Sequence, residues 1–261
     1  MNLLFIGDVV GKGGRLAVRQ LVPELRRQYN CSFVIANVEN VAGGAGISAS
    51  CLTDFAGVVD VYTSGDHVWD QKGFEEEITR FSNLLRPANY NKKQPGKGFE
   101  VFRNSAGGEV AVINLLGKVF MKESSSCPFE TVEGILASLP PTAKTIIVDM
   151  HAEATSEKAA MAHFLDGRVT AVIGTHTHVQ TADATVLPKG TAFISDVGMT
   201  GSINSILGRE IDAVLKKFTS GMPQKLPVVE KDIRLDAVVL SYDMATGRAT
   251  DIKNISVKAG F

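Results

Sequence analysis

The amino-acid sequence predicts an α/β domain in which two β-sheets pack face to face and helices cover their outer sides. Five short apolar runs rich in Val and Ile are typical of buried strands, and each ends in a cluster of polar side chains. Segments with the helical spacing of apolar residues follow several of these runs. Two other segments, at 99–114 and 234–257, have the alternation and turns of β-hairpins, so the sheets are not expected to be purely parallel.

The first half of the chain alternates between expected strands and expected helices. A Gly-rich turn after Asp8 leads into the first helix, and a long loop at 86–98 precedes the first hairpin. The first expected strand ends at Asp8, and the next two cover 33–38 and 59–64. The expected helices cover about 15–29, 50–57 and 71–81.

The second half repeats this pattern. Strands are expected at 145–151, 171–175 and 191–195, and helices at about 129–138, 156–165 and 204–218. We expect Thr155 or Ser156 to cap the helix at 156–165 and Gly167 to end it. No linker or low-complexity segment divides the chain, which predicts a single domain over residues 1–261.

The bulk composition agrees with a soluble enzyme. The chain has 261 residues, 44% of them hydrophobic, and a net charge of −1, which argues against a dedicated nucleic-acid surface. The three cysteines form no CxxC pair, so neither a disulfide framework nor a thiolate zinc site is expected. The chain starts directly in its first expected strand, and no apolar run has membrane-spanning length, so we expect a cytoplasmic protein without membrane contact.

Seven polar side chains at the ends of these strands are candidate metal ligands. In open α/β sheets ligands gather at the carboxyl ends of strands, so side chains that follow different strands should meet there. Carboxylates, an amide and neutral imidazoles suit first-row metals, and seven candidates exceed what one ion needs, so we expect two ions. The candidates are Asp8, Glu39, Asn40, Asp66, His151, His176 and His178.

Two features of the histidines leave alternatives open. His176 and His178 are two residues apart, so an extended backbone would point both rings to one side, whereas a loop could give one ring to each metal. His67 follows Asp66, and on an extended segment it would point away from the metals' ligand shell. We favour His67 as the acid that protonates a leaving oxygen, the alternative being a ring that orients a carboxylate.

The order of these motifs resembles that of the calcineurin-like metallophosphoesterases, and looks closest to their bacterial YmdB-like branch. The likeness covers nearly the whole chain, and together its motifs are highly specific. They are Gly-Asp-Val-Val-Gly-Lys at 7–12, Asn-Val-Glu-Asn at 37–40, Gly-Asp-His at 65–67, Trp-Asp at 69–70, Arg-Pro-Ala-Asn-Tyr at 86–90, Gly-Thr-His-Thr-His at 174–178 and Ser-Asp-Val-Gly-Met-Thr-Gly at 195–201.

The resemblance implies a two-sheet β-sandwich with α/β/β/α layers that hydrolyses 2′,3′-cyclic nucleotides at two divalent ions. Fe, Mn and Zn all accept this mixed donor set, with Fe or Mn favoured. It also implies roles for single residues: Glu39 bridges the ions, and His67 is catalytic without being a ligand. The ligands of one ion would be Asp8, Asn40 and His178, and those of the other Asp66, His151 and His176.

One position departs from the resemblance. Asp66 stands where the superfamily usually has Asn in a Gly-Asn-His motif. Its additional negative charge should make a bridging hydroxide harder to form and should hold phosphate less tightly. Three further residues, Arg86, Asn89 and Thr200, are candidates for lining the substrate pocket, the alternative being ordinary polar loop residues.

The sequence therefore predicts a dinuclear-metal phosphodiesterase that acts on small phosphodiesters by attack of a metal-bridging hydroxide. One alternative is a phosphatase or phosphodiesterase of broader specificity. The other is a non-catalytic, nucleotide-binding regulatory module whose metal site is structural. The expected partner is a small phosphoester or cyclic nucleotide, and a homo-oligomer is left open.

Overall fold

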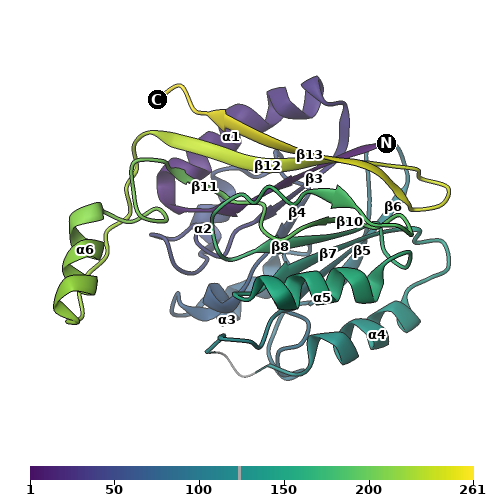
Figure 1. Ribbon diagram of the computed structural model, residues 1–261, viewed down its shortest axis with the longest axis horizontal. Coiled ribbons are helices and arrows are strands. Elements are labelled where there is room, and N and C mark those ends of the chain that lie inside the picture. The colour runs from purple at the N-terminus through teal and green to yellow at the C-terminus, as the bar shows by residue number, and fades with distance from the viewer. Residues whose placement is uncertain (123–124) are drawn as a thin grey trace.

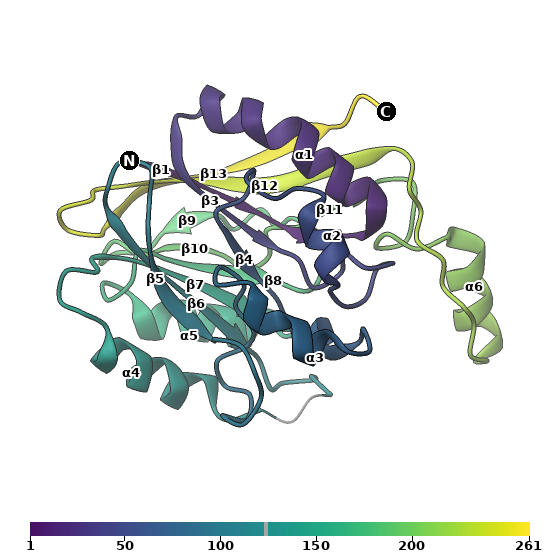
Figure 2. The same ribbon diagram turned by 180° about the vertical axis from the view of Figure 1, so that it is seen from behind.

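The computed structural model describes residues 1–122 and 125–261, and its four layers are helices, sheet, sheet and helices (Figures 1 and 2). The first sheet has the strand order β2-β11-β12-β1-β3-β4, with β13 beside β12. Its strands are β1 (Asn2–Ile6), β2 (Asp8–Val9), β3 (Cys31–Asn37), β4 (Val61–Thr63), β11 (Met199–Ser202), β12 (Ile233–Tyr242) and β13 (Ala249–Lys258).

The second sheet has the order β5-β6-β7-β8-β10-β9. Its strands are β5 (Phe99–Arg103), β6 (Glu109–Leu116), β7 (Thr145–His151), β8 (Ala171–Thr175), β9 (Thr185–Val186) and β10 (Ala192–Ile194). The helices are α1 (Gly11–Gln28), α2 (Ala49–Thr53), α3 (Phe74–Glu77), α4 (Pro128–Ser138), α5 (Thr155–Leu165) and α6 (Ile211–Ser220). Two short 3₁₀ helices are η1 (Asp66–Trp69) and η2 (Ile78–Arg80).

The alternation of side chains along each strand builds three apolar interfaces between the four layers. In β1, Leu3 and Phe5 belong to the core between the two sheets, whereas Leu4 and Ile6 pack with the α1 side. In β7, Ile147 faces the first sheet, and its neighbours on either side pack with the α4 and α5 side. A one-residue slip of either strand would exchange these two faces, so the core sets the register.

Parallel pairing places several strand ends at one edge of the sandwich. β1, β3 and β4 run parallel in the first sheet, and β6, β7, β8 and β10 run parallel in the second. The antiparallel pairs β5–β6 and β12–β13 are the two hairpins that the sequence predicts. The mixed, two-sheet architecture is therefore confirmed.

Several predicted boundaries were wrong for local reasons. The helix predicted at 71–81 begins only at Phe74, because Gly73 has a left-handed backbone with φ 86°, and it continues as the 3₁₀ helix η2. The helix predicted at 204–218 begins at Ile211, because left-handed Leu207 and Gly208 form a turn before it. No side chain caps α5, whose N-cap is Ala154, so neither Thr155 nor Ser156 has the predicted role.

Other differences are smaller. The first helix starts at Gly11 rather than near Arg15, and the helix predicted near 50–57 stops at Thr53. The short strands β2, β9 and β11 were not predicted, because two to four residues carry too little periodicity to be recognised. Among the described helices, none combines the length and the apolar character needed to cross a bilayer.

Candidate metal centre

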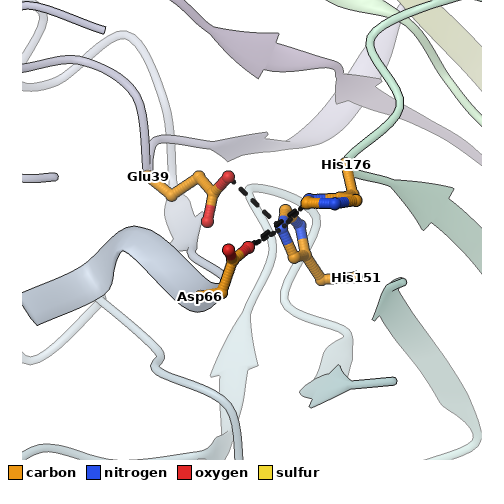
Figure 3. Close-up of side chains that lie close together, drawn as sticks. All are labelled: Glu39, Asp66, His151 and His176. Carbon is orange, nitrogen blue, oxygen red and sulfur yellow. Dashed lines mark hydrogen bonds and ion pairs between the residues drawn. The ribbon is translucent and has the colours of Figure 1, made fainter. Parts of the chain in front are cut away.

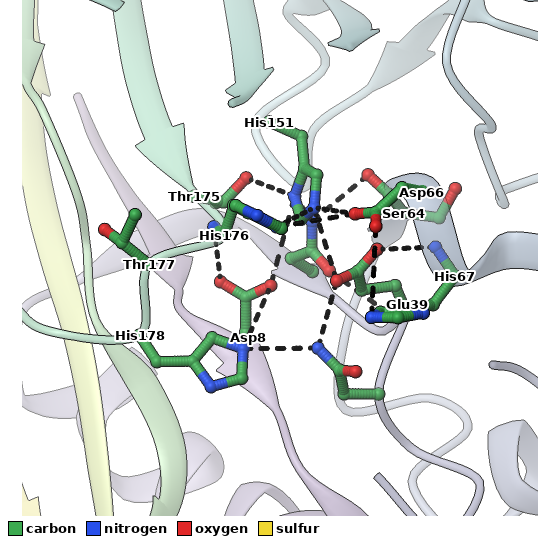
Figure 4. A network of polar contacts seen from close by, with 12 residues as sticks. Asp8, Glu39, Ser64, Asp66, His67, His151, Thr175, His176, Thr177 and His178 are labelled. Carbon is green, nitrogen blue, oxygen red and sulfur yellow. Dashed lines mark hydrogen bonds and ion pairs between the residues drawn. The ribbon is translucent and has the colours of Figure 1, made fainter. Parts of the chain in front are cut away.

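The seven predicted ligands come together where strand ends of both sheets meet. Figure 4 labels six of them, and Asn40 joins them through its contacts with Glu39 and His178. From the first sheet, Asp8 follows β1, Glu39 and Asn40 follow β3, and Asp66 follows β4. From the second sheet, His151 is the last residue of β7, and the loop after β8 carries His176 and His178. Convergence at the carboxyl ends of parallel strands explains why residues so distant in sequence become neighbours.

Four of these side chains form a tight inner group. The ligating atoms of Glu39, Asp66, His151 and His176 all lie within 4.8 Å of one another (Figure 3). His151 Nε2 is at the centre, 3.0 Å from Asp66 Oδ1, 3.2 Å from Glu39 Oε1 and 3.1 Å from His176 Nδ1. Two carboxylates facing two imidazoles at these distances form a mixed oxygen and nitrogen donor set for a transition metal.

The other three side chains adjoin the inner group on the Glu39 side. His178 Nε2 lies 3.3 Å from Asn40 Nδ2 and 4.0 Å from Asp8 Oδ1. Asn40 Nδ2 also donates to Glu39 Oε1 at 3.0 Å, so Glu39 touches both groups, as a bridging carboxylate must. To bind a cation, the Asn40 amide would turn its oxygen toward the site, a rotation that exchanges two atoms of nearly equal size.

The loop that holds the last two histidines separates their rings. His176 and His178 have left-handed backbones, with φ of 99° and 64°, so this segment is not extended. His176 points into the inner group, and His178 into the group around Asp8 (Figure 4). Of the two alternatives for this pair, the loop arrangement is the one observed.

The charges of the cluster compensate one another through His151. Burial alone would lower the pKa of His151, but Glu39 and Asp66 raise it well above its usual value. Burial would raise the pKa of Glu39 and Asp66, but their contacts with His151 lower it. Burial lowers the pKa of His178 to about 4, which keeps this imidazole neutral, as ligation requires. A bound cation would compensate the negative charge of the same carboxylates.

Two observations test whether cations fit among these residues. Asp8 Oδ1 is buried and has no hydrogen-bond partner among the described residues, which is costly for a carboxylate unless a cation binds it. A Cβ on Gly65 would lie 2.2 Å from His151 Nε2 and 2.3 Å from Glu39 Oε2, so only glycine leaves these ligating atoms accessible. The donor set, the oxygen without a hydrogen bond and the glycine together fit a metal centre.

Polar residues behind the ligands fix the orientation of His151. Its Nδ1 lies 2.9 Å from Thr175 Oγ1, and that hydroxyl donates to Asp149 Oδ1 at 2.7 Å. Asn37 Nδ2 donates to Asp149 Oδ2 at 3.2 Å, and Asn37 Oδ1 accepts from the Glu39 backbone N–H at 3.1 Å. Sequence reasoning did not assign roles to Thr175 and Asp149, although Thr175 directly precedes His176 and Asp149 lies two residues before His151.

A buried ion pair anchors the histidine loop. Lys158 Nζ of α5 donates to Asp196 Oδ2 at 2.9 Å, and both side chains are buried. The same oxygen accepts from the backbone N–H and the hydroxyl of Thr177, the residue between the two histidines. Asp196 belongs to the motif at 195–201, but its partner Lys158 gave no signal in the sequence.

His67 lies beside the cluster on η1 rather than on an extended segment. Its Nδ1 is 2.7 Å from Asp70 Oδ2, and its Nε2 is 3.9 Å from Asp66 Oδ2. The predicted extended geometry was wrong, yet a turn of 3₁₀ helix also directs His67 and Asp66 differently. Burial alone would lower the pKa of His67, but Glu39, Asp66 and Asp70 raise it.

A cavity of about 350 Å³ opens onto the cluster. Besides ligand candidates and His67, its wall includes three residues that sequence reasoning missed: Glu153, Leu207 and Arg209. Glu153 Oε2 is 3.1 Å from His176 Nε2. The Arg209 guanidinium donates to the carbonyls of Gly43, Gly44 and Leu226, which fixes a positive charge on the wall.

The three predicted substrate residues lie elsewhere. Arg86 is buried, and its guanidinium donates to the backbone carbonyls of residues 87, 94 and 95. Asn89 is likewise bound to Leu116 and Ser126. Both line a different cavity, of about 920 Å³, between the loop at 86–98 and α4. Thr200 is buried in β11. Their part in substrate binding stays a prediction.

Comparison with known proteins identifies the family. A family model described as "YmdB-like protein" matches residues 4–255. The chain belongs to the YmdB-like family. It is 42% identical over 258 residues to the 2′,3′-cyclic-nucleotide 2′-phosphodiesterase of Bacillus subtilis, covering 98% of this chain and 97% of that protein.

Solved structures agree with this assignment. A structure described as a novel phosphatase from Mycoplasma pneumoniae has a TM-score of 0.92 and 31% identity, covering 99% of this chain and 93% of that one. The calcineurin-like phosphoesterase YfkN from Bacillus subtilis has a TM-score of 0.56 at 13% identity, covering 99% and 90% of the two chains. This YmdB-like protein therefore has the fold of the calcineurin-like phosphoesterases.

Proposed function

We propose that this YmdB-like protein is a metal-dependent phosphodiesterase that hydrolyses small phosphodiesters, above all 2′,3′-cyclic nucleotides. The observation that carries this proposal is the meeting of oxygen and nitrogen donors from both sheets beside His67, with Glu39, Asn40, His176 and His178 of this cluster lining one cavity. The names of its relatives supply the substrate class, a 2′,3′-cyclic nucleotide for the Bacillus subtilis protein. A nucleotide substrate is also consistent with the predicted cytoplasmic location.

The donor set supports two divalent ions, for which we propose Fe or Mn. Oxygen and imidazole ligands without thiolate suit these metals, and Zn accepts them too. When bound, the ions would supply Lewis-acid stabilisation of the phosphate charge and an activated water. The proposed ligands are Asp8, Asn40 and His178 for one ion, Asp66, His151 and His176 for the other, and Glu39 for both.

His67 is the proposed general acid. Asp70 holds its Nδ1, which orients the ring and leaves Nε2 as the nitrogen that can give a proton to substrate. In the reaction, a bond forms between phosphorus and the oxygen of water, and the bond from phosphorus to one ribose oxygen breaks. That ribose oxygen takes the proton from His67, the attacking water releases one proton to solvent, and His67 takes up a proton from solvent before the next turnover. The product is a nucleoside monophosphate.

Two other residues of the cavity wall are placed to contact the substrate. Arg209 carries the positive charge opposite in sign to a phosphodiester, and its hydrogen bonds to three carbonyls keep it in position. Leu207 offers an apolar surface, 47% exposed, against which a base or a ribose could pack. We propose that these two residues bind the parts of the nucleotide that do not react.

The test is hydrolysis of a substrate panel by the purified protein loaded with Mn²⁺ or Fe²⁺. We expect turnover of 2′,3′-cyclic nucleotides to a single monophosphate, and slower turnover of 3′,5′-cyclic nucleotides and phosphomonoesters. Faster turnover of monoesters would favour the broader phosphatase instead. Stoichiometric metal with no turnover of any phosphoester would favour the regulatory module and would overturn the proposal.

A further inference from the structure

Helix α6 stands away from the body of the molecule (Figures 1 and 2). It belongs to the segment that joins β11 to β12, and Val214 is its one buried residue. A helix of 10 residues is marginal in water on its own, because helix nucleation costs more than so few hydrogen bonds return. The helix therefore needs packing that the sandwich of this chain does not give it.

One face of α6 carries an exposed apolar stripe. Its members recur at the spacing that places side chains on one side of a helix. Isolated exposed apolar residues are ordinary, but a row of them on one helix indicates a surface that is covered. They are Ile211 (45% exposed), Leu215 (49%) and Phe218 (74%). Met222, 62% exposed, follows the left-handed Gly221 that ends the helix.

The charges that flank the stripe are divided between the two ends of the helix. Glu210 and Asp212 lie at its amino end, and Lys216 and Lys217 lie in its second half, all four exposed. Glu210 and Lys217 are seven residues apart, so they lie on the same side of the stripe. Asp212 and Lys216 are four residues apart and lie on the other side.

The charges of one α6 helix complement those of a second α6 helix when the two pack antiparallel. If two α6 helices pack antiparallel about a two-fold axis near Val214, Glu210 of each copy faces Lys217 of the other. By the same symmetry, Asp212 faces Lys216, and Ile211 faces Phe218 across the stripe. The helix dipoles are then antiparallel as well. Parallel packing would instead place like charges side by side.

We propose that α6 is a self-association surface, through which two copies of this chain pack antiparallel with their apolar stripes in contact. Such an interface is isologous, because the same patch serves both copies. Charge complementarity selects a second copy rather than an unrelated partner, since the two acids and the two lysines that flank the stripe match in this orientation. Burial of the stripe would provide the packing that α6 lacks.

The first test is sedimentation velocity of the full chain over a wide range of concentrations. We expect a reversible monomer–dimer equilibrium, and Phe218→Asp should raise its dissociation constant about tenfold or more, because it places two charges in the apolar contact. The matched control is Met244→Asp, an exposed apolar residue in the turn between β12 and β13, which should leave the equilibrium unchanged. A monomeric wild-type protein, or a dimer indifferent to Phe218→Asp, would overturn the proposal.

The second test uses the charge pattern and separates antiparallel self-pairing from general stickiness. Glu210→Lys gives α6 lysines at both positions of the pair, and Lys217→Glu gives it two glutamates, so each variant alone should dimerise poorly. Mixed in equal amounts, the two variants should form a heterodimer in which every pair is again opposite in charge. Because both variants keep their altered helix-end charges in the mixture, recovery cannot come from a restored helix. A mixture no more associated than its components would refute the antiparallel geometry.

Discussion

His67 differs from the seven proposed ligands in what its two ring nitrogens contact. Its Nδ1 lies 2.7 Å from Asp70 Oδ2. Among the described residues, the carboxylate oxygen nearest to its Nε2 is Asp66 Oδ2, at 3.9 Å. The ligands, by contrast, are buried or half-buried against one another. A ring held through one nitrogen with the other directed to the cavity is suited to proton transfer rather than to structural support.

His67→Ala should therefore separate chemistry from metal binding. We expect turnover to fall by roughly 10²- to 10⁴-fold, the usual contribution of a general acid, while metal content stays close to that of the wild type. A substrate with a phenolate leaving group should lose less activity, since it needs little protonation. Loss of metal in proportion to activity would make His67 a ligand.

Asp70→Asn should change the pH dependence of turnover. The Asp70 carboxylate is one of the groups that raise the pKa of His67, so its removal should lower that pKa. A general acid works only below its pKa, so the basic limb of the pH–rate profile should move to lower pH. Metal content should not change. A basic limb at the same pH in the variant would show that Asp70 does not raise the pKa of the general acid.

Gly65→Ala should disrupt the centre through the atom that it adds. The φ of Gly65 is negative, at −157°, so alanine meets no left-handed backbone there, and its Cβ would lie against His151 Nε2 and Glu39 Oε2. We expect loss of metal and of activity together. Gly134→Ala in α4 is the control, since its Cβ meets open space and alanine favours helix. Full metal occupancy in Gly65→Ala would contradict this geometry.

At the scale of elements, the metal centre depends on a contact between α5 and the loops after β8 and β10. Lys158 reaches from α5 to Asp196, which in turn holds Thr177 between the two histidines. Gly174 allows this approach, because a Cβ there would lie 2.8 Å from Lys158 Cδ and 1.9 Å from Ser195 O. The position of a helix thus determines where two ligands lie.

Lys158→Met should lower both stability and metal affinity. The substitution leaves Asp196 buried without its counter-charge, which typically costs about 3–5 kcal/mol of unfolding free energy. Lys97→Met removes an exposed ion pair with Glu100 and should cost at most about 1 kcal/mol. Denaturant unfolding and metal titration measure the two effects. Equal stability of the two variants would show that the buried ion pair contributes no more to the free energy of unfolding than the exposed one.

At the scale of the whole molecule, the proposed ions would join the two sheets. The first sheet presents Asp8, Glu39, Asn40 and Asp66, and the second presents the three histidines. Because the ligands converge only in the folded chain, metal binding must stabilise the fold. Metal binding should therefore raise the free energy of unfolding of the whole sandwich rather than stabilise a single loop.

Chelation should therefore lower the melting temperature. Metal at about 100 times its dissociation constant adds about 2.7 kcal/mol to the stability of the native state. For a chain of this size that corresponds to a shift of roughly 5–10 °C. Gly65→Ala, which should not bind metal, is the control and should melt at the same temperature with and without chelator. An unchanged melting temperature for the wild type would contradict ligation across the sheets.

The sequence by itself determined the longer strands, the hairpins and the identity of the residues that gather at the centre. Each proposed ligand stands at or just after an apolar run, and strand ends of parallel sheets meet at one edge, so local pattern was enough to select them. The buried core likewise follows from the alternation along each strand, because a pleated strand has only two faces.

Only the tertiary structure decided which residues become neighbours in detail. The left-handed backbones at His176 and His178 separate their rings, and no periodicity encodes such a turn. Arg209 reaches the cavity and Lys158 reaches Asp196 through contacts between distant segments, whereas Arg86 lines a different cavity. Side-chain direction depends on how elements pack around a residue, and that packing is a property of the whole chain rather than of any window of its sequence.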